Sequence, residues 1–75
     1  PKPKLVTNLI SSNTIVITSP GTFGYAIYDF NGKIVTKGQL INGLNNIDAS
    51  YITSGMYLVQ FTGIAGRWVD KLVRH

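Results

Sequence analysis

Residues 25–73, which read YAIYDFNGKIVTKGQLINGLNNIDASYITSGMYLVQFTGIAGRWVDKLV, decide the fold of this chain. Runs rich in β-branched and aromatic residues alternate along this stretch with clusters of Gly, Asn, Asp and Ser. Apolar residues recur at every second position, as in half-buried strands, whereas the helical period of about 3.6 residues does not appear. The stretch therefore predicts antiparallel strands joined by tight turns.

The same pattern continues toward the N-terminus and predicts up to seven short strands in all. The expected strands cover residues 5–10, 14–18, 24–29, 33–40, 45–48, 55–62 and 67–73, with a connection over residues 49–54. Short strands at a spacing of about ten residues are typical of a sandwich of two sheets. We therefore expect an all-β fold, an immunoglobulin-like antiparallel β-sandwich.

The two ends of the domain are predicted from composition. Residues 1–4 contain two prolines and two lysines with nothing to pack, and we interpret them as the remnant of a linker. The folded domain is expected over residues 5–75. Because the chain opens with Pro1 and not with Met, we interpret its start as a boundary made by cloning or by processing.

The turn around Gly32 admits two registers. A two-residue Asn31-Gly32 loop is the first. A three-residue loop is the second; it begins the turn at Asp29 and places Gly32 in the left-handed position of a bulge. This second register pairs Asp29 with Lys33, Tyr28 with Ile34 and Ile27 with Val35. We choose it because it gives an opposite-charge pair and two apolar pairs, and it predicts a positive φ at Gly32.

The strand over residues 55–62 supplies the predicted core. Tyr57, Val59 and Phe61 share one face and are expected to be buried. The opposite face carries Met56, Leu58 and Gln60. The expected neighbours of the buried face are Ile15, Ile17, Ile27 and Val35.

Trp68 is expected to be partly exposed, because it shares a strand face with Asp70. An exposed Trp can stack on a sugar ring. A small carbohydrate-binding accessory module of a secreted enzyme is therefore the alternative function. A sugar-binding site of this kind would show the Trp68 ring flat and exposed.

The composition offers no catalytic or metal-binding cluster. The chain has no Cys and no Glu, and its single histidine, His75, stands at the chain end, as a native terminus or as the start of a purification tag. No Gly-x-Ser-x-Gly elbow and no glycine-rich phosphate loop is present. We expect no enzymatic activity, no metal and no cofactor.

The formal net charge of +4 comes from seven scattered cations against three acids. Nucleic-acid-binding surfaces usually gather Lys and Arg on one face, so a nucleic acid is not the predicted partner. No apolar run approaches the roughly 20 residues of a membrane-spanning helix, so we predict no membrane insertion.

Five motifs follow one another along the chain. They are Asp29-Phe30-Asn31-Gly32-Lys33, Gly38 with the turn Asn42-Gly43-Leu44-Asn45, Ile47-Asp48-Ala49-Ser50, Ser54-Gly55-Met56-Tyr57-Leu58-Val59 and Lys71-Leu72-Val73-Arg74. In this order and spacing the chain resembles the C-terminal sorting domain of proteins exported by the bacterial type IX secretion system (type A, Por secretion system family). The resemblance covers roughly residues 8–75. It departs at Asn8-Leu9-Ile10, which lacks the proline of the Asn-Pro element that usually opens the domain.

The resemblance implies a sandwich at the C-terminus of a larger protein, joined to an N-terminal cargo domain. The type IX translocon would recognise the domain after it folds in the periplasm and pass it across the outer membrane. A sortase-like peptidase would then usually remove the domain at its N-terminal side. The cargo would be released as a secreted protein or attached to lipopolysaccharide at the cell surface.

The resemblance also implies which residues the translocon recognises. They are Asp29, Gly32, Lys33, Gly55, Tyr57, Lys71, Leu72, Val73 and Arg74. We expect Lys71 and Arg74 to be exposed strand charges, whose removal changes stability by less than about 0.5 kcal/mol. We also expect the terminal strand to offer backbone donors at a sheet edge.

Overall fold

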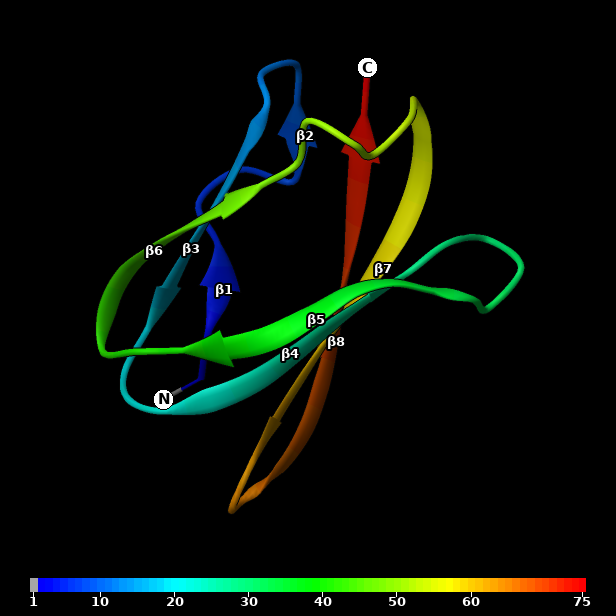
Figure 1. Cartoon of the computed structure of the whole chain (residues 1–75). Helices are drawn as coiled ribbons and strands as arrows, with labels where there is room; N and C mark the ends of the chain where they lie inside the picture. The colour runs from blue at the N-terminus through cyan, green and yellow to red at the C-terminus, as the bar shows by residue number, and fades with distance from the viewer. Residues whose placement is uncertain (1) are drawn as a thin grey trace.

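The computed structural model describes residues 2–75 and consists of two β-sheets that face each other (Figure 1). In chain order the strands are β1 (Lys4–Leu5), β2 (Leu9–Ile10), β3 (Thr14–Ser19), β4 (Phe23–Tyr28), β5 (Ile34–Leu40), β6 (Gly43–Asp48), β7 (Gly55–Gly63) and β8 (Gly66–Arg74). The predicted all-β sandwich is confirmed. Within residues 2–75, the structure contains no helix that is long and apolar enough to cross a bilayer.

One sheet has three strands in the order β1-β3-β6, and the other has five in the order β2-β8-β7-β4-β5. Neighbouring strands are antiparallel except β2, which runs parallel to the end of β8. The long β7–β8 hairpin therefore lies in the middle of the larger sheet, and the C-terminus of the chain is held between β7 and β2.

The predicted strand over residues 5–10 is wrong, because the structure divides it into β1 and β2, which belong to different sheets. The connecting residues cross between the sheets: Val6 N–H donates to Val16 O in one, and Asn8 O accepts from Val73 N–H in the other. The side chain of Thr7 bonds to the backbone of Leu9, which favours a local bend over a continuous strand. The other six predicted strands are confirmed, with ends that differ by at most two residues.

The expectation that residues 1–4 have nothing to pack is wrong for two of them. Pro3 is fully buried, and Lys4 pairs with Thr18 in the three-stranded sheet. Pro1 lies outside the described residues. The domain boundary at residue 5 stays a prediction.

The β4–β5 turn has the three-residue loop that the sequence predicts. Asp29 N–H donates to Lys33 O (2.9 Å), Gly32 N–H donates to Asp29 O (3.0 Å), and Gly32 has a φ of 83°. The pairing of Tyr28 with Ile34 is confirmed. The predicted pairing of Ile27 with Val35 is wrong: Ile27 pairs with Thr36, because a bulge makes Val35 an extra residue on its strand.

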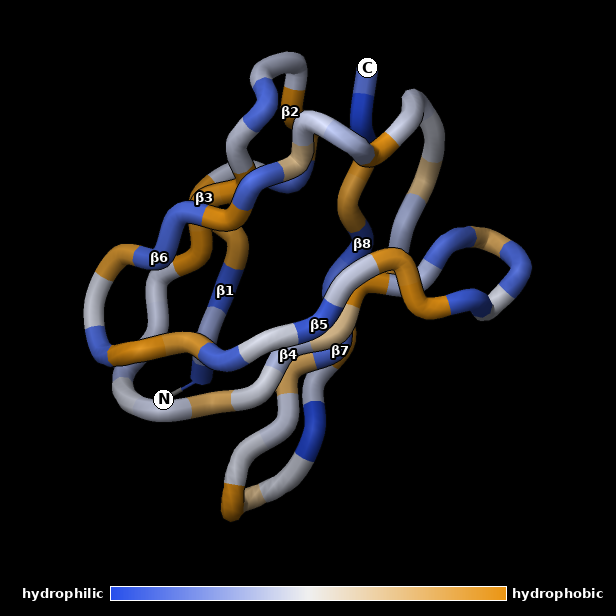
Figure 2. Tube along the Cα trace, in the orientation of Figure 1, coloured by the Kyte–Doolittle hydropathy of each residue, from blue (hydrophilic) through white to orange (hydrophobic). Residues whose placement is uncertain are grey.

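The core fills the space between the sheets. Tyr57, Val59 and Phe61 are buried, as predicted, and Ile15, Ile17 and Ile27 pack with them, whereas Val35 is only half-buried against this core. Figure 2 shows hydrophobic and hydrophilic residues alternating along the strands, which is why one face of each sheet turns inward. The full buried set is Ile10, Ile15, Ile17, Ile27, Leu40, Ile47, Ala49, Ile52, Tyr57, Val59, Phe61 and Leu72.

Candidate recognition surface

The β7–β8 hairpin brings six of the nine predicted recognition residues to one end of the larger sheet. Its register pairs Gly55 with Arg74, Met56 with Val73, Tyr57 with Leu72 and Leu58 with Lys71. Alternate residues of a strand point to opposite faces. The terminal Lys71-Leu72-Val73-Arg74 motif is therefore divided: Leu72 and Arg74 turn toward the other sheet, and Lys71 and Val73 turn away from it.

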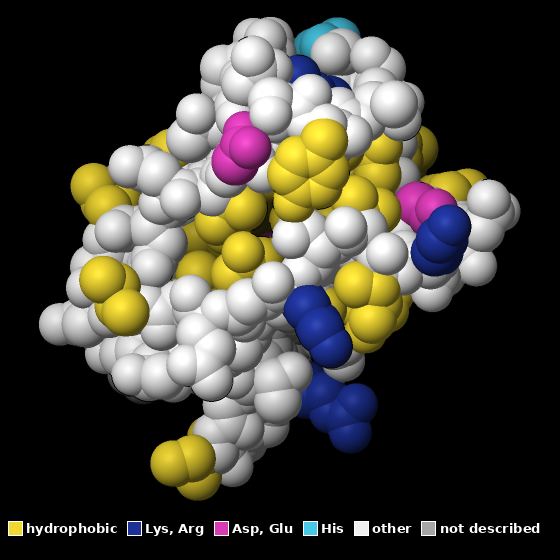
Figure 3. Space-filling view, viewed as in Figure 1, with side chains coloured by type: hydrophobic (Ala, Val, Ile, Leu, Met, Phe, Trp, Pro, Cys, Tyr) yellow, Lys and Arg dark blue, Asp and Glu magenta, His cyan; other side chains and the backbone are white. Residues whose placement is uncertain are grey.

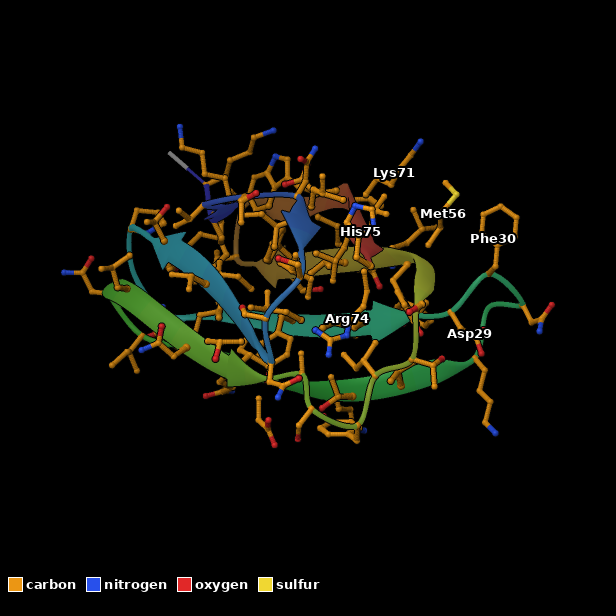
Figure 4. All side chains as sticks on the ribbon, turned by 90° about the horizontal axis from the view of Figure 1, so that it is seen from above. Asp29, Phe30, Met56, Lys71, Arg74 and His75 are labelled. Atoms are coloured by element: carbon orange, nitrogen blue, oxygen red, sulfur yellow. The ribbon has the colours of Figure 1, made fainter. Side chains whose placement is uncertain are left out.

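Arg74 is not an exposed strand charge, so that expectation is wrong. Its Nε donates to Ile52 O (3.0 Å), one Nη donates to Ser12 O, and the other Nη donates to Asn13 Oδ1 (2.8 Å). Figure 4 shows its side chain lying between the layers. The Arg74 cluster, by which we mean Arg74 with Ser12, Asn13 and Ile52, joins the β2–β3 and β6–β7 connections to the last strand.

The β2–β3 and β6–β7 connections also bond to each other, since Ala49 N–H donates to Asn13 O at 2.8 Å. Isolated carbonyl groups at the end of a sandwich would otherwise have to be satisfied by water. The guanidinium carries several donors in a fixed plane, which lets one side chain satisfy acceptors on two segments. The Arg74 cluster therefore closes this end of the sandwich.

Tyr57 and Leu72 also contribute to the fold. Leu72 is fully buried and Tyr57 is 7% exposed. The Tyr57 hydroxyl donates to Thr53 O at 2.6 Å, which anchors the β6–β7 connection. Gly55 has a φ of 149°, a backbone conformation that side-chain-bearing residues rarely adopt. A partner protein cannot touch the two buried side chains directly.

The turn residues Asp29 and Gly32 have a structural role as well. Asp29 Oδ1 accepts from the N–H groups of Asn31 and Lys33, both at 2.9 Å. This arrangement satisfies the donors of the turn and holds its tip outward. Lys33 is exposed, and Phe30 at the tip is 79% exposed.

A row of side chains crosses the outer face of the larger sheet on four adjacent strands. Ile34 pairs with Tyr28, Tyr28 pairs with Leu58, and Leu58 pairs with Lys71. We call Ile34, Tyr28, Leu58 and Lys71 the outer-face row. Ile34 is 46% exposed and Leu58 is 44% exposed. The row therefore presents three partly exposed apolar or aromatic side chains that end at a lysine.

Two further side chains flank the outer-face row. Met56 precedes Leu58 on the same face of β7 and is also exposed, and Phe30 follows Tyr28 in the turn. Figure 4 shows Lys71, Met56 and Phe30 projecting from the same side of the molecule, away from Arg74. A solvated sheet face normally carries polar residues at these positions. The patch is therefore typical of a surface that contacts another protein.

Sequence reasoning identified Lys71 but missed its apolar neighbours Ile34, Tyr28, Leu58 and Met56 as site residues. One signal was available: β7 is apolar on both faces, with Met56 and Leu58 opposite the core residues Tyr57 and Val59. A strand that covers a core with one face only would alternate apolar with polar residues. That signal could identify β7 as part of a site. It could not identify Ile34 and Tyr28, because only the pairing of β7 with β4 and of β4 with β5 places them beside Leu58.

Titratable groups are sparse on this domain. Burial raises the pKa of the Tyr25 hydroxyl, and the nearby Tyr51 adds to the effect. A backbone hydrogen bond from Ser50 holds the pKa of Asp48 below its ordinary value. In the view of Figure 3, Lys and Arg side chains form no continuous basic surface. Among residues 2–75, no three acidic or His side chains are grouped so that they could hold a metal ion.

Trp68 is half-buried, as its shared face with Asp70 predicted. It packs against the core, and its ring lies 5.7 Å from the ring of Phe23 at an interplanar angle of 60°. A sugar-binding platform requires a flat and open aromatic face. The carbohydrate-binding alternative is therefore not favoured.

The chain is similar to a known protein family. A family model described as the secretion system C-terminal sorting domain matches residues 11–75. No curated protein and no solved structure matches the chain.

Proposed function

This chain belongs to the secretion system C-terminal sorting domain family, the C-terminal sorting signals of type IX secretion, and we propose that the translocon reads its folded outer face. A domain of this family is a signal that the type IX machinery recognises on an attached cargo protein, and the family is not catalytic. The observation that supports our proposal is the outer-face row, which no other strand of residues 2–75 covers.

Two kinds of residue serve recognition in this proposal. Lys33, Lys71 and Val73 lie on the surface that the translocon contacts, together with Phe30 and Leu58. The remaining predicted residues act through the fold: Asp29 and Gly32 shape the turn, Gly55 and Tyr57 order the start of β7, and Leu72 and Arg74 fix β8. Recognition then depends on a fully folded domain, since the last strand enters the core at Leu72.

The dependence on folding fits the export route that we propose. The cargo protein and its sorting domain fold in the periplasm, and the folded domain then engages translocon components that pass the protein across the outer membrane. A sortase-like peptidase cleaves on the N-terminal side of the sandwich. The cargo is released, or is attached at the cell surface. The support for this order is that the recognised face forms only when four strands pair.

A reporter fused ahead of residues 1–75 in a type IX-competent bacterium tests the proposal. We expect the wild-type fusion to reach the cell surface or the medium, and Leu58→Glu to remain in the periplasm. Leu44→Glu is the matched control, because Leu44 is 66% exposed on the other sheet. Both variants should unfold at temperatures within about 5 °C of wild type. Export of Leu58→Glu at the wild-type level would contradict recognition of the outer face by the translocon. If the wild-type fusion is not exported, the sorting function is contradicted.

A further inference from the structure

The edge of the larger sheet is only partly covered at β8. β2 pairs with the end of β8 through Leu9 with Val73 and Ile10 with Arg74. β2 has two residues and β8 has nine, and within residues 2–75 no other strand pairs with this edge. Residues 67–71 of β8 are therefore bonded to β7 on one side and have no strand on the other.

The free backbone groups along this edge can be assigned from the two bonds that β2 makes. Val73 N–H donates to Asn8 O at 2.8 Å, and His75 N–H donates to Ile10 O at 3.0 Å. Successive residues of a strand direct their N–H groups to opposite sides. Lys71, Val69 and Arg67 therefore direct their N–H and C=O groups to the same side as Val73, where the edge is open. The side chains of all three are exposed.

The space beside this edge is a groove. Leu5 at the end of β1 and residues 6–8, which connect β1 to β2, form one wall, and Asp70 and Lys71 form the other. Followed from β2 back toward β1, this connecting segment leaves β8 and crosses to the other sheet. It therefore does not cover residues 67–71 of β8. An added strand could continue along the line of β2 into this groove.

The side chains on the free edge carry a charge pattern. On the outer face, Arg67 and Lys71 flank Val69, which is 57% exposed, and the acidic Asp70 belongs to the opposite face. If a second copy of the chain paired with this edge antiparallel about Val69, Arg67 of each copy would lie opposite Lys71 of the other. Like charges directly opposite each other destabilise a strand pair. The edge is therefore unsuited to pairing with itself along its full length.

We propose that an extended segment of a type IX machinery protein adds to the β8 edge as a strand over residues 67–71. The segment carries acidic side chains opposite Arg67 and Lys71 and an apolar side chain opposite Val69, a pattern that reads the same in either strand direction. Its backbone completes the hydrogen bonds that Arg67, Val69 and Lys71 leave open. The identity of this partner rests on the proposed sorting function, and the edge is a second contact beside the outer-face row.

Val69→Pro tests the backbone part of the proposal in the reporter fusion. Proline removes the N–H group that faces the open edge and leaves the ladder to β7 intact, a position where strands tolerate it. We expect surface delivery to fall by about tenfold or more, as for a lost hydrogen bond in a partner complex. Val69→Thr is the matched control, because it keeps the N–H group, and it should deliver the reporter within about threefold of wild type.

The charge part is tested by Arg67→Glu combined with Lys71→Glu. We expect this variant to fold and to lose delivery by about tenfold or more, because it places like charges opposite the acidic partner. Lys2→Glu combined with Lys4→Glu is the matched control: it changes the net charge equally at exposed positions at the start of the chain and in β1 of the other sheet. If both reversed pairs reduce delivery equally, the effect belongs to net charge and the proposed edge contact is wrong.

The outcomes separate this inference from the sorting function. Wild-type delivery together with normal delivery by a folded Val69→Pro variant would overturn the edge contact and leave the sorting function intact. If Val69→Pro does not fold, Arg67→Glu alone decides, because Arg67 lies on the open edge and outside the outer-face row. Absence of delivery by wild type itself would overturn both. Sedimentation of the purified chain tests whether a second copy of the chain pairs with the β8 edge instead. A dimer that Val69→Pro dissociates would assign the edge to that second copy and contradict our proposal.

Discussion

Two basic residues of the same terminal motif lie in contrasting regions of this domain. Arg74 sits at the closed end of the sandwich, where its guanidinium bonds to backbone carbonyls of Ser12 and Ile52 and to the side chain of Asn13. Lys71 sits on the outer face beside Leu58, exposed to solvent. Arg74 follows Lys71 by three positions. Because successive side chains of a strand point to opposite faces, an odd spacing places the two on opposite faces of β8.

The contrast shows that a short terminal motif can carry two separate functions. The inward residues, Leu72 and Arg74, make β8 part of the fold, and the outward residues, Lys71 and Val73, give it a surface. Deleting the whole motif would remove both at once, so a loss of export after deletion would not tell which function failed. Single substitutions on the two faces separate the two functions.

The largest effect is expected from Tyr57→Ala, on the inner face one residue from Leu58. Tyr57 is 7% exposed and its hydroxyl donates to Thr53 O, so the substitution removes a buried ring and a buried hydrogen bond. We expect a loss of about 3–5 kcal/mol in the free energy of unfolding. Urea denaturation measures it. Leu58→Ala on the outer face is the control, and an equal loss in both variants would contradict the division between faces.

Arg74→Ala is expected to cost less but still to destabilise clearly. The variant leaves the carbonyls of Ser12 and Ile52 without the guanidinium donors, which costs about 2–3 kcal/mol for hydrogen bonds to a charged group. Arg74→Lys keeps the charge but cannot supply the planar set of donors, so it should recover only part of the stability. Thermal unfolding followed by circular dichroism distinguishes the three proteins. Full recovery in the lysine variant would mean that charge, and not donor geometry, closes this end.

Acid should loosen the same end slightly. Ser50 N–H donates to Asp48 Oδ1 (3.0 Å) in the connection that Arg74 holds, and this bond lowers the pKa of Asp48 below its ordinary value of 3.8. A lowered pKa contributes stability that is present above the ordinary value and is lost as the pH falls through the folded-state pKa. We expect the Asp48→Asn variant to lose less stability than wild type between pH 5 and about pH 3. Denaturation at the two pH values measures the difference; parallel losses would exclude Asp48 from the acid response.

The smallest effect on stability is expected from Lys71→Ala. An exposed charge on a strand changes the free energy of unfolding by less than about 0.5 kcal/mol, so the folded domain should be unchanged. Export of the fused reporter should nevertheless fall, because Lys71 ends the outer-face row. A variant that folds normally and accumulates in the periplasm would show direct recognition of this charge. Export at the wild-type level would show that the translocon does not read the Lys71 charge.

The β4–β5 turn illustrates what local sequence can and cannot specify. The three-residue loop and the positive φ of Gly32 followed from the residues on the two sides of the turn, since the register was chosen from pairs such as Asp29 with Lys33 and Tyr28 with Ile34. The bulge at Val35 did not follow, although it lies only three residues away. β4 pairs with β7 as well as with β5, so its surroundings in the sheet include a segment far along the chain.

The N-terminal segment and the Arg74 side chain show the same limit over longer distances. Nothing near residues 5–10 in the sequence reveals that β1 and β2 join different sheets, because their partners are β3 and the end of β8. The sequence pattern placed Arg74 on a terminal strand and thereby suggested an exposed charge. Its acceptors come from residues 12, 13 and 52, which only the folded sandwich brings together.

By itself, the sequence determined the all-β class, six of the strands, the turn chemistry and the family, since these depend on period-two alternation and on turn residues at fixed local offsets. Tertiary structure decided which strands are neighbours. It thereby decided that Ile34, Tyr28, Leu58 and Lys71 form one row, that Arg74 closes the sandwich, and that β2 covers only the end of the β8 edge. The physical reason is that strand pairing joins residues by backbone hydrogen bonds between distant segments, and no local pattern encodes that choice of partner.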